Sequence, residues 1–253
     1  MKNLYKANML RLFKDKLYYA GLILAAVMTY SISLGNMELL KMHNIGHNEC
    51  MKLISGAVYC FIGIYAAVFQ GIEFSDGVIR NKITMGYTKR QIYISHLLVS
   101  FSMMVIMEIV WFISGLAAGG TVDRDLIGYA FSMMFSMFSY CAFMTFLSFI
   151  TRKPAAAGGF GTVLFYALFT LCLITNYLYA FLSEKAATKI IVLFENVNAV
   201  GQWFLNTIFA SPEVSSGGYP NSYGIPAQIL ISIALVILFT LLGTHKLSKQ
   251  DIN

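Results

Sequence analysis

The chain has 253 residues, of which 58% are hydrophobic and only 12% are charged, and its mean hydropathy is +0.67. A soluble domain carries about 25% charged residues, so this composition argues against a soluble enzyme, a disulfide-rich secreted module and a disordered chain. The net charge of +6 could suit nucleic acid, but the basic residues lie between long apolar runs, where they report membrane topology.

The first element in the chain is a basic leader, residues 1–16. Its apolar side chains share one helical face: Tyr5, Met9, Leu12 and Phe13. Its basic side chains occupy the rest of the helix surface: Lys2, Lys6, Arg11 and Lys14. This pattern predicts an amphipathic helix in the cytoplasmic interface, attracted by anionic headgroups. The alternative is a positively charged flank that only sets topology.

Six apolar segments are long enough to cross a bilayer core about 30 Å thick as helices. They are residues 17–34, 53–72, 94–117, 126–150, 155–176 and 225–242. We therefore predict an all-α, polytopic membrane protein in which residues 1–253 form a single transmembrane domain.

The distribution of positive charge predicts the orientation. If both termini are cytoplasmic, 13 of the 18 Lys and Arg residues lie inside and five lie outside. Because cytoplasmic loops carry an excess of Lys and Arg, this bias predicts a multi-pass protein of the cell membrane with both termini in the cytoplasm.

Two loops are large enough to do more than connect spans. One is cytoplasmic, residues 73–93, and the other is external, residues 177–224. In the external loop, five residues follow a helical spacing: Phe194, Val197, Gly201, Phe204 and Ile208. A turn-rich segment, residues 211–220, comes after them. We expect a short helix and an irregular return that together cap the external side.

Motifs for catalysis are weak in this sequence. We find no GxxxxGK[ST] phosphate loop and no HExxH, and the glycine-rich run at 158–161 lacks the phosphate-loop lysine. His43 and His47 are four residues apart but have no third metal ligand nearby, and the four cysteines show no CxxC spacing. We therefore predict a chain without catalytic residues, a metal site or a cofactor of its own.

Glu108 is the one acidic residue near the middle of an apolar segment. An ionised carboxylate there costs a few kcal/mol unless it is protonated, paired or hydrated. It is a candidate substrate-path residue in a hydrated cavity. The alternative is a neutral acid that is hydrogen-bonded to a neighbouring helix.

The cytoplasmic loop reads E-F-S-D-G-V-I-R-N-K-I-T-M-G-Y-T-K-R-Q from Glu73. Gly77 and Gly86 bracket a predicted helix, residues 78–85, and could turn the chain out of one span and into the next. Three apolar residues could form a docking surface: Val78, Ile79 and Ile83. Four cations would surround this surface: Arg80, Lys82, Lys89 and Arg90. Glu73 could hydrogen-bond the start of this turn or pair with one of those cations. The alternative is an ordinary positively charged loop.

This loop resembles the permease subunits of ABC-2-type transporters, in which an acid, then G-x-I-R-N, then G-x-[ST]-R leads into the third span. The C-terminal sequence G-T-H-K-L-S-K-Q-D-I from Gly243 is similar to the family's closing G-x-x-x-F-x-x-x-D-I, with Leu247 where an aromatic residue is usual. His96 stands where a lysine is common.

The resemblance implies that two cytoplasmic ABC ATPase subunits bind ATP and Mg²⁺, and that a second permease copy or homologue completes a dimer. It implies that residues 78–85 form a coupling helix that docks on the ATPase. For small bacterial members it implies export of amphipathic, antimicrobial or toxin peptides, but drug, ion and polysaccharide exporters share the scaffold. An ATP-independent secondary transporter or a channel is the alternative from another class; such transporters usually show internal repeats, and none is visible here.

Overall fold

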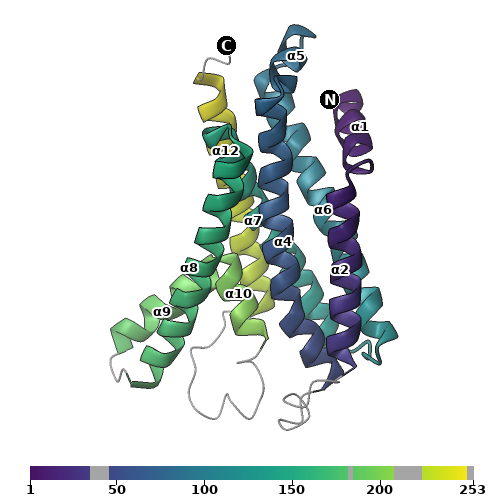
Figure 1. Ribbon diagram of the computed structural model, residues 1–253. Coiled ribbons are helices and arrows are strands. Elements are labelled where there is room, and N and C mark those ends of the chain that lie inside the picture. The colour runs from purple at the N-terminus through teal and green to yellow at the C-terminus, as the bar shows by residue number, and fades with distance from the viewer. Residues whose placement is uncertain (35–45, 182–184, 208–223, 250–253) are drawn as a thin grey trace.

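The computed structural model describes residues 1–34, 46–181, 185–207 and 224–249, and within these ranges the regular secondary structure is α-helical (Figure 1). The helices are α1 (Lys2–Leu12), α2 (Lys16–Ser33), α4 (His47–Ser75), α5 (Val78–Thr84), α6 (Lys89–Ala117), α7 (Arg124–Thr151), α8 (Pro154–Phe181), α9 (Lys185–Val197), α10 (Ala199–Asn206) and α12 (Ile225–Lys249).

Five helices in the described part of the chain are long and apolar enough to cross a membrane: α4, α6, α7, α8 and α12. They contain five of the six predicted segments and extend beyond most of the predicted ends. The chain therefore has the architecture of a polytopic helical membrane protein. The first predicted segment, residues 17–34, forms the 18-residue helix α2, which is outside this set of five. At 1.5 Å per residue α2 is about 27 Å long, close to the thickness of a bilayer core, so its length is not what separates it from the other five.

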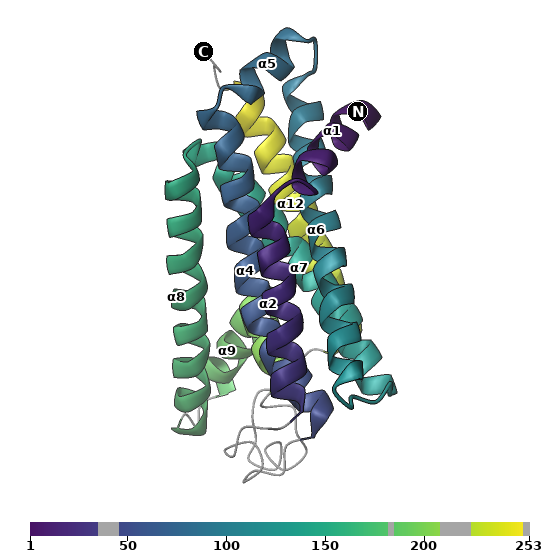
Figure 2. The ribbon, with the colours of Figure 1, turned by 45° about the vertical axis from the view of Figure 1, so that its right-hand side comes forward.

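The long helices run side by side, and the short elements lie at the two ends of the bundle (Figure 1, Figure 2). At one end, here called the α5 end, lie α1, α5 and the last turns of α12. At the opposite end lie α9 and α10. The 13 basic residues that the charge distribution predicts to lie on one side of the membrane belong to segments at the α5 end.

The outer faces of the long helices are apolar. Large hydrophobic side chains are exposed along α2 at Ile23, along α8 at Val163 and along α12 at Leu230, each more than 60% accessible. A soluble monomer rarely exposes such continuous apolar surface, so these faces suit contact with lipid.

Local sequence signals explain where α6 begins. Thr88 caps the helix by accepting a hydrogen bond from the Gln91 backbone N–H (3.2 Å), and the Gln91 side chain accepts one from the Thr88 N–H (3.0 Å). This reciprocal capping box satisfies two backbone donors that the first helical turn leaves unpaired. It fixes α6 to start at Lys89, five residues before the predicted apolar segment.

The segment before α12 differs from the prediction. The fifth span continues to Phe181, and two helices, α9 and α10, follow where we expected one short helix. Residues 208–223, which hold Ile208 and the turn-rich segment, lie outside the described residues. Gln202 and Trp203 of α10 are buried, and the Trp203 indole N–H donates to the carbonyl oxygen of Lys52 (3.1 Å). Helix α10 is thus packed into the bundle.

Candidate functional site

Helix α5 is set between two glycines that have left-handed backbone conformations. Gly77 has φ +68° and Gly86 has φ +89°, a region that other L-residues rarely adopt. At the C-terminal end the Tyr87 N–H donates to the Lys82 carbonyl (3.2 Å) and the Gly86 N–H to the Ile83 carbonyl (2.9 Å). These two bonds form a Schellman motif, which ends the helix one residue earlier than predicted.

The carboxylate of Glu73 is the centre of the site. It lies in the last turn of α4, is 1% exposed and binds three basic groups that come from three other helices. Lys82 of α5 donates to Oε2, His96 Nε2 of α6 lies 2.8 Å from the same oxygen, and Arg11 Nη1 of α1 lies 2.5 Å from Oε1. Glu73 therefore joins α1, α4, α5 and α6 at one point.

The ammonium group of Lys82 is buried within this cluster, which we call the Glu73 cluster: Glu73, Arg11, Lys82, His96 and Asn8. Lys82 also donates to Asn8 Oδ1 (2.9 Å), and Asn8 Nδ2 donates to Ser95 Oγ (3.1 Å). Burial lowers the pKa of Lys82 below its ordinary value, and the adjacent Glu73 carboxylate opposes that shift. The ion pair with Glu73 is thus what keeps a charged lysine stable in this position.

Arg11 attaches the leader helix to α4. Besides its ion pair with Glu73, its guanidinium donates to the Phe69 carbonyl (3.3 Å) and lies 4.6 Å from the centre of the Phe69 ring. Because the Arg11 side chain is one-third exposed, water screens its share of the attraction more than that of Lys82. The predicted amphipathic helix is therefore held by specific contacts as well as by its apolar face.

An apolar cluster packs beside the Glu73 cluster and fixes α5 from within. Ile79 of α5 is 1% exposed and is buried together with residues from α1, α6, α7 and α12, namely Leu4, Ile92, Tyr93, Leu97, Ala142, Phe149 and Leu247. Ile83 is half-buried and packs against the same cluster. The inner side of α5 is therefore part of the protein core.

The C-terminal motif residues reach this apolar cluster. A Cβ on Gly243 would overlap the Tyr93 ring, so the glycine allows α12 to approach α6 closely. The Tyr93 hydroxyl donates to the Phe239 carbonyl (3.1 Å), and Leu247 fills the cluster one turn farther on. The two sequence segments that carry the family resemblance are thus in contact at the α5 end.

The outward side of α5 is formed by other residues than those predicted. Arg80, Asn81 and Thr84 are exposed, and Met85 is 73% exposed. Of the residues predicted to form an apolar docking surface, Ile79 is buried and Val78 and Ile83 are half-buried. The exposed apolar side chain at this tip is Met85, with Arg80 and Arg90 as the exposed cations.

The structure brings together some predicted site residues and separates others. Glu73 and Lys82 pair, as one of the sequence-based options expected, so the Lys82 charge faces inward and is unavailable to a partner. Arg11, Asn8 and His96 complete the cluster, although no sequence pattern identified them as partners of Glu73. The available signal was weak: Asn8 falls between Leu4 and Leu12 on the buried stripe of α1.

Glu108 lies in α6, about three turns beyond His96 of the Glu73 cluster, and is 8% exposed. Neither carboxyl oxygen has a hydrogen-bond partner among the described residues. Tyr59 and Tyr129 are its electrostatic neighbours. The described structure therefore does not contain the hydrogen bond from a neighbouring helix that the alternative interpretation of Glu108 requires.

The sequence matches no known protein-family model and no curated protein. The likeness to ABC-2 permeases accordingly rests on residues 73–98, on the residues after Gly243 and on the helical membrane architecture.

Proposed function

We propose that this chain is the transmembrane subunit of an ATP-driven exporter of the ABC-2 type, and that α5 is the coupling helix on which a cytoplasmic ATPase docks. The observation that carries the proposal is the two-sided packing of α5. Its inner side is joined to five other helices through Lys82 and Ile79, whereas its outer side, with Met85 at the tip, is uncovered.

A coupling element must move together with the spans that it drives. Displacing α5 alone would separate the buried Lys82 ammonium from the Glu73 carboxylate, which costs about 3–5 kcal/mol for a pair in such surroundings. It would also withdraw Ile79 from its apolar cluster. Moving α1, α4, α5 and the start of α6 as one unit avoids both costs, so a force applied at Met85 is passed to the spans.

The remaining parts of the proposal follow from the resemblance. Partner subunits bind ATP and Mg²⁺, a second permease copy or homologue completes the assembly, and the α5 end with both termini is cytoplasmic at the cell membrane. The substrates are amphipathic, antimicrobial or toxin peptides. Glu108 is the candidate polar residue on the substrate path.

The test is Met85→Asp, with ATPase copurification and peptide transport as readouts. A charge at an exposed tip leaves the fold intact but places an unpaired carboxylate in the docking interface, so both readouts should fall. Ile83→Asp is less suitable, because Ile83 packs against the core and its substitution would disturb the fold itself. Val122→Asp, which places the same charge at a 60% exposed site at the opposite end, is the matched control.

Two results would count against the proposal. If Met85→Asp retains full ATPase binding and full transport, α5 is not the docking element. If the wild-type chain transports without ATP and binds no ATPase, the secondary transporter or channel is the better interpretation.

A further inference from the structure

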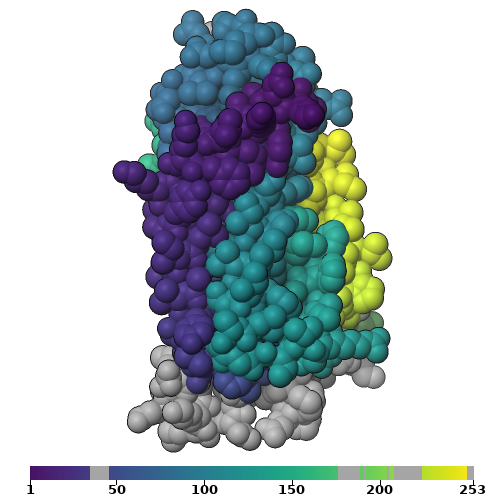
Figure 3. Space-filling view, turned by 90° about the vertical axis from the view of Figure 1, so that its right-hand side faces the viewer, coloured from purple at the N-terminus to yellow at the C-terminus, as the bar shows by residue number. Residues whose placement is uncertain are grey.

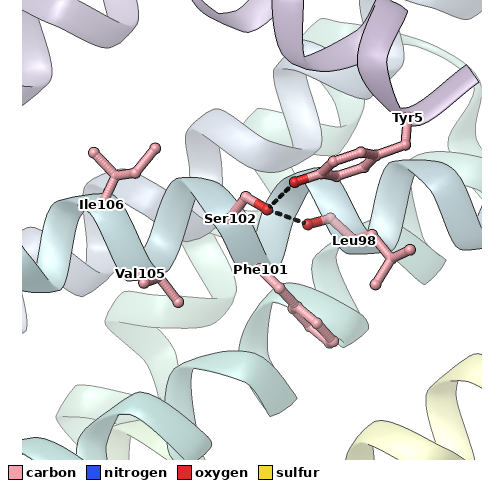
Figure 4. A pocket seen from close by; sticks show the side chains of 6 residues that line it. All are labelled: Tyr5, Leu98, Phe101, Ser102, Val105 and Ile106. Carbon is pink, nitrogen blue, oxygen red and sulfur yellow. Dashed lines mark hydrogen bonds between the residues drawn. The ribbon is translucent and has the colours of Figure 1, made fainter. Parts of the chain in front are cut away.

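A groove lies between α1 and α6, separate from the Glu73 cluster. Its volume is about 370 Å³, and it is lined by one residue of α1 and five of α6: Tyr5, Leu98, Phe101, Ser102, Val105 and Ile106 (Figure 4). The two polar side chains in this lining are bonded to each other, because the Tyr5 hydroxyl lies 2.7 Å from Ser102 Oγ, which in turn donates to the Leu98 carbonyl (2.9 Å). The groove therefore offers a surface for hydrocarbon.

The position of the groove matches the inner half of a bilayer. Helix α1 lies across the part of α6 nearest the α5 end (Figure 3). Leu98 and Ile106 are eight residues apart, about 12 Å along α6 at 1.5 Å per residue, which is close to the hydrocarbon thickness of one leaflet, about 15 Å. An acyl chain in the groove would thus have its headgroup at the level of α1.

Two lysines lie on the flank of α1 that borders the groove. At about 100° per residue, Lys2 is about 60° from Tyr5 around the helix and Lys6 is about 40° farther in the same direction, whereas Arg11 is about 120° from Tyr5 in the opposite direction. Arg11 faces α4 and is bound to Glu73, but Lys2 and Lys6 are exposed and form no salt bridge among the described residues. The groove therefore combines an apolar floor with unneutralised positive charge at its headgroup end.

We propose that this groove binds one anionic phospholipid of the surrounding leaflet, with an acyl chain along α6 and its phosphate next to Lys2 and Lys6. The charge is what selects the occupant. A zwitterionic lipid could fill the apolar floor equally well but would gain little from two ammonium groups. A second copy of the chain would bring its own Lys2 and Lys6 to a basic surface and be repelled. The bound lipid would hold α1 against α6 on the flank opposite the Arg11 contact.

The first test measures lipid selectivity by native mass spectrometry of the full-length protein released from nanodiscs that contain equal amounts of phosphatidylglycerol and phosphatidylcholine. We expect one phosphatidylglycerol to be retained per chain in preference to phosphatidylcholine. Lys2→Gln/Lys6→Gln should lower that preference by about fivefold for each lysine, because a lysine near an anionic surface contributes on the order of 1 kcal/mol. Lys14→Gln/Lys16→Gln removes the same charge at the same membrane end but away from the groove, and should retain most of the preference.

The second test fills the groove. Val105→Trp places an indole in it, whereas Ile109→Trp places one at a 52% exposed site one turn farther along α6. The first should abolish retention of the lipid and the second should leave it unchanged. Equal retention of the two lipids by the wild type, equal effects of the two lysine pairs, or full retention by Val105→Trp would each overturn the proposal.

Discussion

Replacing Glu73 by Gln removes the charge on which the Glu73 cluster depends while nearly preserving shape. Lys82, whose side chain is 10% exposed, would keep Asn8 Oδ1, a neutral amide oxygen and the His96 Nε2 that lies 3.4 Å away, none of which carries a negative charge. His96, which is fully buried, would lose its anionic acceptor as well. The substitution therefore leaves a buried cation without a counter-charge.

The magnitude follows from the burial of this pair. Breaking a buried ion pair by removing one partner costs about 3–5 kcal/mol. Arg11, being one-third exposed, adds little because water can solvate it. Since 1 kcal/mol shifts the melting temperature of a chain of this size by about 2–4 °C, Glu73→Gln should lower it by about 6–20 °C. In Glu73→Gln/Lys82→Met the stranded ammonium group is gone, so part of the loss should be recovered.

Thermal denaturation of the purified protein in detergent, followed by size-exclusion chromatography, measures these shifts. Asp76→Asn is the matched control, because Asp76 is an exposed acid only three residues away that forms no salt bridge among the described residues. It should change the melting temperature by no more than about 2 °C. If Glu73→Gln has the same melting temperature as Asp76→Asn, or if the double variant melts no higher than Glu73→Gln, the Glu73 cluster does not hold the site together.

Three further predictions concern other parts of the chain. Gly86→Ala should destabilise by about 1–2 kcal/mol because φ is +89°. Gly159→Ala, in the second turn of α8 with open space at its Cβ, should be neutral or stabilising, and melting temperatures that fall in both variants would contradict this. Glu108→Leu should leave the melting temperature unchanged or raise it, since it strands no partner in the described structure, and a loss of 1–3 kcal/mol would reveal a hydrogen bond to Glu108. A thiol introduced by Asn81→Cys should react with an impermeant reagent only after the cell is opened, and one introduced by Val122→Cys should react in intact cells; the reverse pattern would invert the topology.

The positions of the spans could be predicted because runs of about 20 apolar residues leave few alternatives in lipid. The bracketing of α5 was predictable for a similar reason, since Gly77 and Gly86 allow a backbone that other residues resist. In both cases the signal is local and physically strong. The ends of the helices were less accurate, because caps such as Thr88 and Gln91 extend α6 beyond its apolar run.

The contacts between distant segments could not be predicted. The sequence offered several cations for Glu73, and the choice of Lys82 and Arg11 depends on how α1 and α5 pack against α4. The same packing turned Ile79 inward and left Met85 at the tip. An amphipathic pattern on a helix of two turns does not say which side faces the rest of the protein. The burial of α10 was missed for this reason too, because its packing against Lys52 joins residues far apart in the chain.

The central claim, that α5 docks on an ATPase, is tested most directly by photocrosslinking from Met85. A photoreactive amino acid at Met85 should form an adduct, in membranes of the native cell, with a protein whose peptides contain a GxxxxGK[ST] phosphate loop, and added ATP should change the yield. The same residue at Val122, at the opposite end of the bundle, should give no such adduct. If Met85 yields no adduct with a nucleotide-binding protein, or if Val122 yields the same one, the assignment of α5 as a coupling helix is wrong.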